Sequence, residues 1–102
     1  METKTATQMA TVYGLKSSIA FNKLLEKCGV LTATEKGYVL AEALRGQELT
    51  VVINVPWFMP NGFKVYKKKA AWTEKGQQFL RQRLGRIGIV PANEQQDMFS
   101  AN

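Results

Sequence analysis

The sequence contains no histidine and a single cysteine, Cys28. These absences exclude disulfide frameworks, the usual zinc ligand sets and every nucleophile that needs an imidazole base. Acidic residues are also few, eight in all, and they are scattered singly, so no close pair of carboxylates is available for acid–base catalysis. We therefore expect no catalytic residue, no bound metal and no cofactor, and a protein that is not an enzyme.

Long apolar runs are missing as well. No stretch approaches the roughly 18 uncharged apolar residues that a membrane-spanning helix needs, and residues 1–7 lack the order of a signal peptide. We expect a cytoplasmic protein with no membrane partner. With 102 residues, 45% of them hydrophobic and 22% charged, the chain has the length and composition of one ordinary globular domain.

Positive charge is abundant, and it is concentrated in one segment. Residues 64–86 hold eight lysines and arginines against the single acidic residue Glu74, whereas the rest of the chain holds six basic and seven acidic residues. Such a concentration is typical of a surface that meets a polyanion. A basic face kept only for solubility is the alternative, because charge by itself does not identify a partner.

The N-terminal part predicts two short helices joined by a tight turn. Thr5 and Gln8 have the spacing of a capping box, and Gly14 can end the first helix in a left-handed conformation. Ser17 can cap a second helix, which Gly29 closes. Its expected buried stripe is Ile19, Ala20, Leu24 and Cys28, widened by Phe21 and Leu25. The pair is a helix-turn-helix candidate, although any small domain can hold a helical hairpin.

Two hairpins are predicted next. Residues 30–40 form a short one, followed by helix formers at 41–45. In the longer one, Pro56 cannot donate to a ladder and predicts a sheet edge or a bend, while Asn61 and Gly62 tolerate positive φ and predict the turn. The returning arm carries Lys64, Lys67, Lys68 and Lys69. A lysine-rich hairpin beside a helix-turn-helix has the features of a wing that holds phosphates, although lysines on an exposed strand also suppress aggregation.

A third helix is predicted after Trp72. Thr73 can cap it, and Gly76, one turn after Trp72, suggests that an aromatic ring lies over the first turn of the helix. The expected buried stripe is Phe79, Leu80, Leu84 and Ile87. Arg81, Arg83 and Arg86 lie toward the C-terminal end, where they suit either the helix dipole or phosphate groups.

These elements predict a domain over residues 5–88, between an N-terminal tail, residues 1–4, and a polar C-terminal tail, residues 89–102. Met98 and Phe99 form an apolar pair in the second tail that could contact a second copy, so a homodimer stays open.

Five segments together resemble a known family. They are TATQMA (5–10), YGL (13–15), NKLLEKCGV (22–30), KGY (36–38) and WTEKGQQFL (72–80). In order and spacing they resemble the C-terminal KilAC domain of phage antirepressors, which usually follows a separate N-terminal domain. The resemblance implies a winged-helix, DNA-associated module whose second helix is the recognition helix. Its exposed positions here would be Lys16, Ser17, Ser18, Asn22, Lys23 and Lys27.

The expected fold is therefore α+β: a winged helix-turn-helix of three helices with a long β-hairpin wing. The expected function is that of a non-enzymatic, antirepressor-like regulator from a phage or mobile element, which binds double-stranded DNA. The second helix would enter the major groove, and the lysines and arginines would hold phosphates. The alternative is a protein-interaction module that docks on a repressor or replication protein. Exposed Trp57, Phe58 and Met59 near the hairpin tip would favour it, because such side chains anchor protein interfaces.

Overall fold

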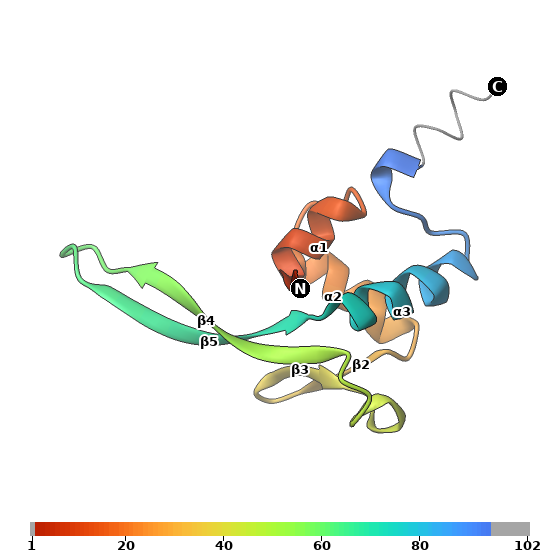
Figure 1. Ribbon diagram of the computed structural model, residues 1–102, viewed down its shortest axis with the longest axis horizontal. Helices are drawn as coiled ribbons and strands as arrows, with labels where there is room; N and C mark the ends of the chain where they lie inside the picture. Colours follow the sequence, from red (N-terminus) through yellow and green to blue (C-terminus); the bar gives the residue numbers. More distant parts are fainter. Residues whose placement is uncertain (1, 95–102) are drawn as a thin grey trace.

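A computed structural model describes residues 2–94 of the chain. The expected α+β class is confirmed, with antiparallel strands in two sheets and a long hairpin that projects away from the helices (Figure 1). The 3₁₀ helix η1 lies where helix formers were noted and adds a helical segment to the three predicted helices. The elements are β1 (Lys4–Thr5), α1 (Ala6–Val12), α2 (Ser18–Lys27), β2 (Leu31–Thr34), β3 (Gly37–Leu40), η1 (Glu42–Leu44), β4 (Thr50–Phe58), β5 (Lys64–Trp72) and α3 (Glu74–Gly85).

The caps of α1 and α2 form as the sequence predicts. The Thr5 N–H donates to Gln8 Oε1 at 2.9 Å, and the Gln8 N–H donates to Thr5 Oγ1 at 3.3 Å, which completes the capping box. Gly14 has a φ of 71°, the left-handed conformation that ends α1. The Ala20 N–H donates to the Ser17 hydroxyl at the start of α2.

The buried face of α2 agrees with the predicted one in part, at Phe21 and Leu25, and differs from it at Ile19. Phe21 and Leu25 are completely buried, whereas Ile19 is 64% exposed. Leu24 and Cys28 are only partly buried at the margin of the core. The apolar residues span more than one face of the helix, so their spacing alone does not fix which face turns inward. The stacked rings of Tyr13 and Phe21, with centroids 6.2 Å apart, fix that orientation against α1.

The larger sheet has the order β1-β5-β4, so β4 is an edge strand, as Pro56 predicted. The Thr73 N–H donates to the Leu49 carbonyl, and the Met59 N–H donates to the Phe63 carbonyl. The backbone N–H and C=O groups of odd-numbered β4 residues therefore bond to β5, and those of even-numbered residues point away from β5, toward the open edge of the sheet. At Pro56 the proline ring thus replaces a backbone N–H that would point toward the open edge. A further strand therefore cannot bond to β4 at this position.

The turn of the long hairpin is wider than predicted. The Gly62 N–H donates to the Met59 carbonyl, and the Phe63 N–H donates to Asn61 Oδ1. Gly62 has a φ of 89°, but Glu48 is the one non-glycine residue within 2–94 with a positive φ, so Asn61 does not use this freedom. The loop is a three-residue turn with a glycine bulge, a common alternative to the two-residue turn.

α3 begins at its predicted cap, because the Gly76 N–H donates to the Thr73 hydroxyl at 3.0 Å. A Cβ at Gly76 would lie 2.0 Å from the Leu49 carbonyl oxygen and 3.1 Å from Trp72 Cε3. The close approach of the Leu49 backbone, just before β4, is thus the main reason why position 76 holds glycine. The contact with the Trp72 ring, which the sequence predicted, is the lesser reason. Leu80 and Leu84 are buried as predicted, but Ile87 lies beyond α3 and is 57% exposed.

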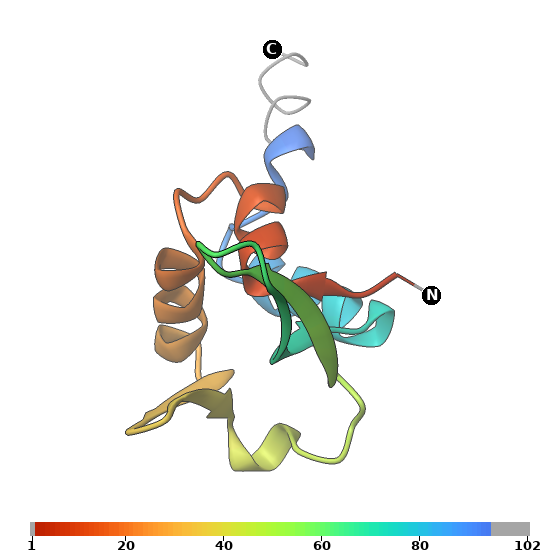
Figure 2. The same ribbon diagram turned by 90° about the vertical axis from the view of Figure 1, so that its left-hand side faces the viewer.

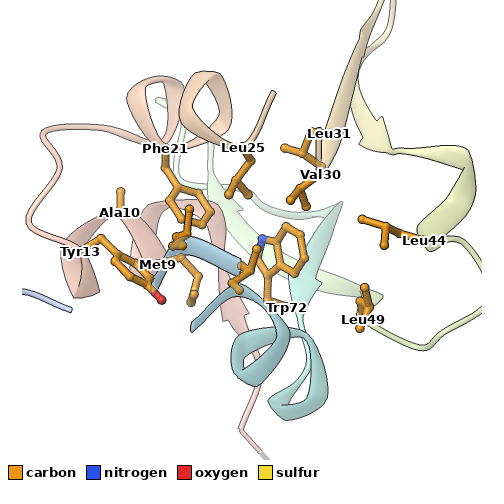
Figure 3. Packing of buried hydrophobic residues seen from close by; sticks show 12 residues of the cluster. Met9, Ala10, Tyr13, Phe21, Leu25, Val30, Leu31, Leu44, Leu49 and Trp72 are labelled. Atoms are coloured by element: carbon orange, nitrogen blue, oxygen red, sulfur yellow. The ribbon is translucent and has the colours of Figure 1, made fainter. Parts of the chain in front are cut away.

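The core lies between α1, α2 and α3 and the bases of both hairpins (Figure 3). Trp72, at the end of β5, is buried among side chains from α1, α2 and the segments on either side of η1. Lys4 and Thr5 pair with Trp72 and Ala71, so the chain joins the sheet at Lys4, within the stretch expected as a tail. Met98 and Phe99 lie outside the described residues.

Candidate nucleic-acid interface

A cleft of about 500 Å³ opens between α1, α2, the β2–β3 hairpin and the base of the β4–β5 hairpin. It is lined by Thr5, Ala6, Thr7, Ser18, Asn22, Leu31, Tyr38, Val39, Leu40, Arg45, Thr50, Lys69, Ala70 and Trp72. Viewed along the long hairpin, which projects toward the viewer, α2 lies to one side of that hairpin and the β2–β3 hairpin lies below α2 (Figure 2). The cleft therefore combines residues that lie far apart in the sequence.

The start of α2 contributes two of the residues expected to contact DNA. Ser18 and Asn22, one helical turn apart, are half-buried and line the cleft. Ser17 is exposed, and its hydroxyl oxygen already accepts the capping bond from Ala20. The other expected residues of this region, Lys16, Lys23 and Lys27, are exposed and do not line the cleft.

Two cations border the cleft. Lys69 comes from β5, as expected, and Arg45 comes from the segment after η1, where its Nε donates to the Leu40 carbonyl at 3.1 Å. Partial desolvation of the phenol and, next, the nearby Glu26 carboxylate raise the pKa of Tyr38. No acidic residue lines the cleft within the described part of the chain, so its charged groups are cationic.

The remaining expected lysines lie along the projecting hairpin. Lys64, Lys67 and Lys68 are exposed on β5, opposite Phe58, Val55 and Asn54 of β4. The structure thus places one expected lysine, Lys69, in the lining of the cleft to which Ser18 and Asn22 also belong, and the other three follow along β5 toward the hairpin turn.

Arg81 and Arg83 are not brought to the cleft. Arg81 forms an ion pair with Glu94 and lines a separate cavity with Tyr13. Arg83 donates to the Cys28 carbonyl at 3.3 Å, and its guanidinium lies 5.0 Å from the centre of the Phe79 ring. Neither arginine lines the cleft, and the view along the long hairpin places α3 on the other side of that hairpin from α2 (Figure 2). Both arginines therefore have structural partners within the domain.

Sequence reasoning missed Arg45, Tyr38 and Thr50. They reach the cleft because the chain turns back through η1 between the two hairpins. No pattern of neighbouring residues in the sequence predicts this turn. The one available signal was that Arg45 is among the few basic residues outside 64–86. No helix within residues 2–94 is long and apolar enough to cross a membrane, and no group of three potential metal ligands is found there.

Residues 2–86 match the family model described as phage antirepressor protein KilAC domain. The chain belongs to this family. No curated protein and no solved structure matches it. The match spans every element from β1 to α3 and confirms the resemblance carried by the five sequence segments. It identifies a KilAC domain with a phage-related regulatory role, in a family that is regulatory and not catalytic.

Proposed function

We propose that this KilAC domain is an antirepressor-like regulator that binds double-stranded DNA in the cytoplasm. The observation that carries the proposal is that the start of α2 and Lys69 of the long hairpin border one cleft, to which residues 2–94 contribute no acidic side chain. A cationic surface with polar side chains presented by a helix suits the phosphates and base edges of a duplex. The proposal includes no chemical step, in keeping with the regulatory character of the family.

The proposed arrangement is a winged helix-turn-helix. α1 and α2 are the helix-turn-helix, and α2 enters the major groove with Asn22 and Lys23 toward base edges. An asparagine can pair with adenine and a lysine can reach guanine acceptors, each contributing about 1–3 kcal/mol of discrimination. The long hairpin is the wing. The β2–β3 hairpin directly follows α2, but its turn carries one acidic residue, Glu35, as well as one basic residue, Lys36.

The phosphate contacts are assigned to the long hairpin and not to α3. Lys64, Lys67, Lys68 and Lys69 follow one another along a strand that leaves the cleft. Arg81 and Arg83 have internal partners and lie on another side of the domain, so we assign them to stabilising α3. If four to six phosphates are contacted in all, log K should fall against log salt with a slope of about −4 to −5.

A gel-shift series on random duplex at increasing salt tests the proposal. Replacing Lys67, Lys68 and Lys69 with glutamine should weaken binding to all sequences alike and make the slope shallower by about 3, since each phosphate contact contributes about 0.9. The matched control replaces Lys4, Lys75 and Arg86 with glutamine, which removes the same charge away from the cleft. Equal slopes for the two triple variants, or no binding by the unaltered protein at low salt, would refute the proposal.

A second candidate function is docking on a repressor or a replication protein. Its specific support is the exposure of Trp57, Phe58 and Met59 at the hairpin tip, because aromatic and methionine side chains are enriched in protein interfaces. The same salt series separates the two functions. Absence of duplex binding at low salt, together with recovery of a repressor in a pull-down, favours docking. Assembly into a homodimer is compatible with either function.

A further inference from the structure

The long hairpin forms an arm, residues 50–72, whose charge is entirely positive. From Leu49 to Thr73 there is no aspartate or glutamate, and the arm carries Lys64, Lys67, Lys68 and Lys69. Two nine-residue strands at about 3.3 Å per residue give the arm a length of about 30 Å. A second copy of this chain would bring a second arm of the same sign, so charge complementarity points to a polyanion as the occupant.

The tip of the arm is apolar and faces solvent. Phe58 is 68% exposed, Phe63 is 70% exposed and Met59 is 42% exposed, and they flank the loop of residues 60–62. Holding phosphates requires cations and does not use exposed aromatic rings. The partner of the tip must therefore offer apolar surface as well as negative charge.

Lysines lie directly against the aromatic rings of the arm. Lys64 Nζ is 5.9 Å from the ring centre of Phe58 and 5.3 Å from that of Tyr66. Lys67 Nζ is 4.6 Å from the ring centre of Trp57. Each ammonium group thus accompanies an aromatic ring, so a partner that reaches the ring must also accept a cation. Nucleic acid combines these properties, because its phosphates surround stacked bases.

We propose that the arm tip acts as an apolar wedge, with Phe58, Met59 and Phe63 entering between two base pairs of a bound duplex and bending it. The wedge deepens the proposed function and rests on it: the lysines hold the flanking phosphates while the tip partly unstacks one step. Apolar side chains on proteins that bend DNA act in this way, and the unstacking is offset by the additional contacts that a bent duplex makes. Pyrimidine–purine steps are the preferred sites, because they unstack most easily.

The test uses the full chain and a 30-base-pair duplex with one central TA step. A donor and an acceptor dye label the two ends, and 2-aminopurine replaces the central adenine. Bending raises energy transfer between the ends, and unstacking raises 2-aminopurine fluorescence. The Phe58→Ala/Phe63→Ala variant should lose both signals and bind about tenfold more weakly, as expected for the loss of one aromatic stacking contact, with an unchanged salt slope. Both side chains are exposed, so the variant should remain folded, which its melting temperature verifies.

Ile87→Ala is the matched control, since it removes an exposed apolar side chain that lies after α3 and outside the arm, and it should keep both signals. Duplex binding by the unaltered protein without either signal, or equal signals in the double variant, overturns the wedge and leaves the DNA-binding function in place. No duplex binding by the unaltered protein at low salt overturns both, and the apolar tip then belongs to a protein contact.

Discussion

Replacing Gly76 with alanine tests how α3 is seated against the chain that leads into β4. The added Cβ would lie 2.0 Å from the Leu49 carbonyl oxygen and 2.9 Å from its carbon, where ordinary contacts begin at 3.4 Å. Both atoms belong to the backbone, so no side-chain rotation can relieve the overlap. The same carbonyl accepts the Thr73 N–H at 3.0 Å and the Thr73 hydroxyl at 3.1 Å, so a shift of α3 also strains these bonds.

The expected loss of stability follows from three contributions. Overpacking that moves backbone costs about 1–3 kcal/mol, and the weakened bonds to Leu49 cost about 1 kcal/mol. Alanine returns up to about 1 kcal/mol through its higher helix propensity. The net loss is about 1–3 kcal/mol. For a domain of this size that lowers the melting temperature by at least about 4 °C.

Thermal unfolding followed by circular dichroism measures this change, and Gly85→Ala is its control. Gly85 lies in the same helix with no atom within 4 Å of an added Cβ, so its replacement should be neutral or slightly stabilising. Equal melting temperatures for Gly76→Ala and Gly85→Ala would show that the contact with Leu49 does not hold α3 in place.

Two further predictions concern α2 and Tyr13. Phe21→Ala should lower the free energy of unfolding, measured by chemical denaturation, by about 3–5 kcal/mol, because the ring is fully buried. Ile19→Ala should change it by less than about 0.5 kcal/mol, because that side chain is exposed. A larger loss for Ile19→Ala than for Phe21→Ala would contradict the burial of the Phe21 face of α2. Burial raises the pKa of Tyr13, and the charge of Arg81 opposes that rise. The folded state therefore retains the phenolic proton above about pH 10, where the unfolded chain loses it, so this contribution to stability is complete below pH 10 and is lost as pH rises through the folded pKa. Melting temperatures should consequently fall more steeply above pH 10 in the unaltered protein than in Tyr13→Phe, and parallel pH profiles would contradict the assignment.

Local chemistry predicted where most elements begin and end. The capping box of Thr5 and Gln8, the caps at Ser17 and Thr73, and the left-handed Gly14 depend on side-chain and backbone groups within a few residues. The sequence therefore contains all the partners involved. Pro56 belongs to the same class, since its missing N–H predicted a sheet edge or a bend, and the structure has it on the edge strand β4.

The makeup of the cleft could be predicted only in part. Ser18, Asn22 and Lys69 were named from the sequence and meet at one site, whereas Arg45 arrives through η1 and was not expected there. Arg81 and Arg83 belong to the same basic stretch as Lys69 but lie elsewhere. A charge count along the chain cannot separate them, because a strand followed by a helix turns successive side chains toward different sides of the domain.

The sequence by itself determined the caps, the turns, the hairpins and the positive charge of the arm, because each depends on neighbouring residues or on composition. Only the tertiary structure decided which face of α2 is buried and which cations border the cleft. Apolar residues cover more than one face of α2, and the choice between Ile19 and Phe21 depended on how the ring of Tyr13 packs against the helix. Likewise, Lys69 and Asn22 line one cleft because the base of the arm packs against α1, which in turn packs against α2, and these contacts join segments far apart in the sequence.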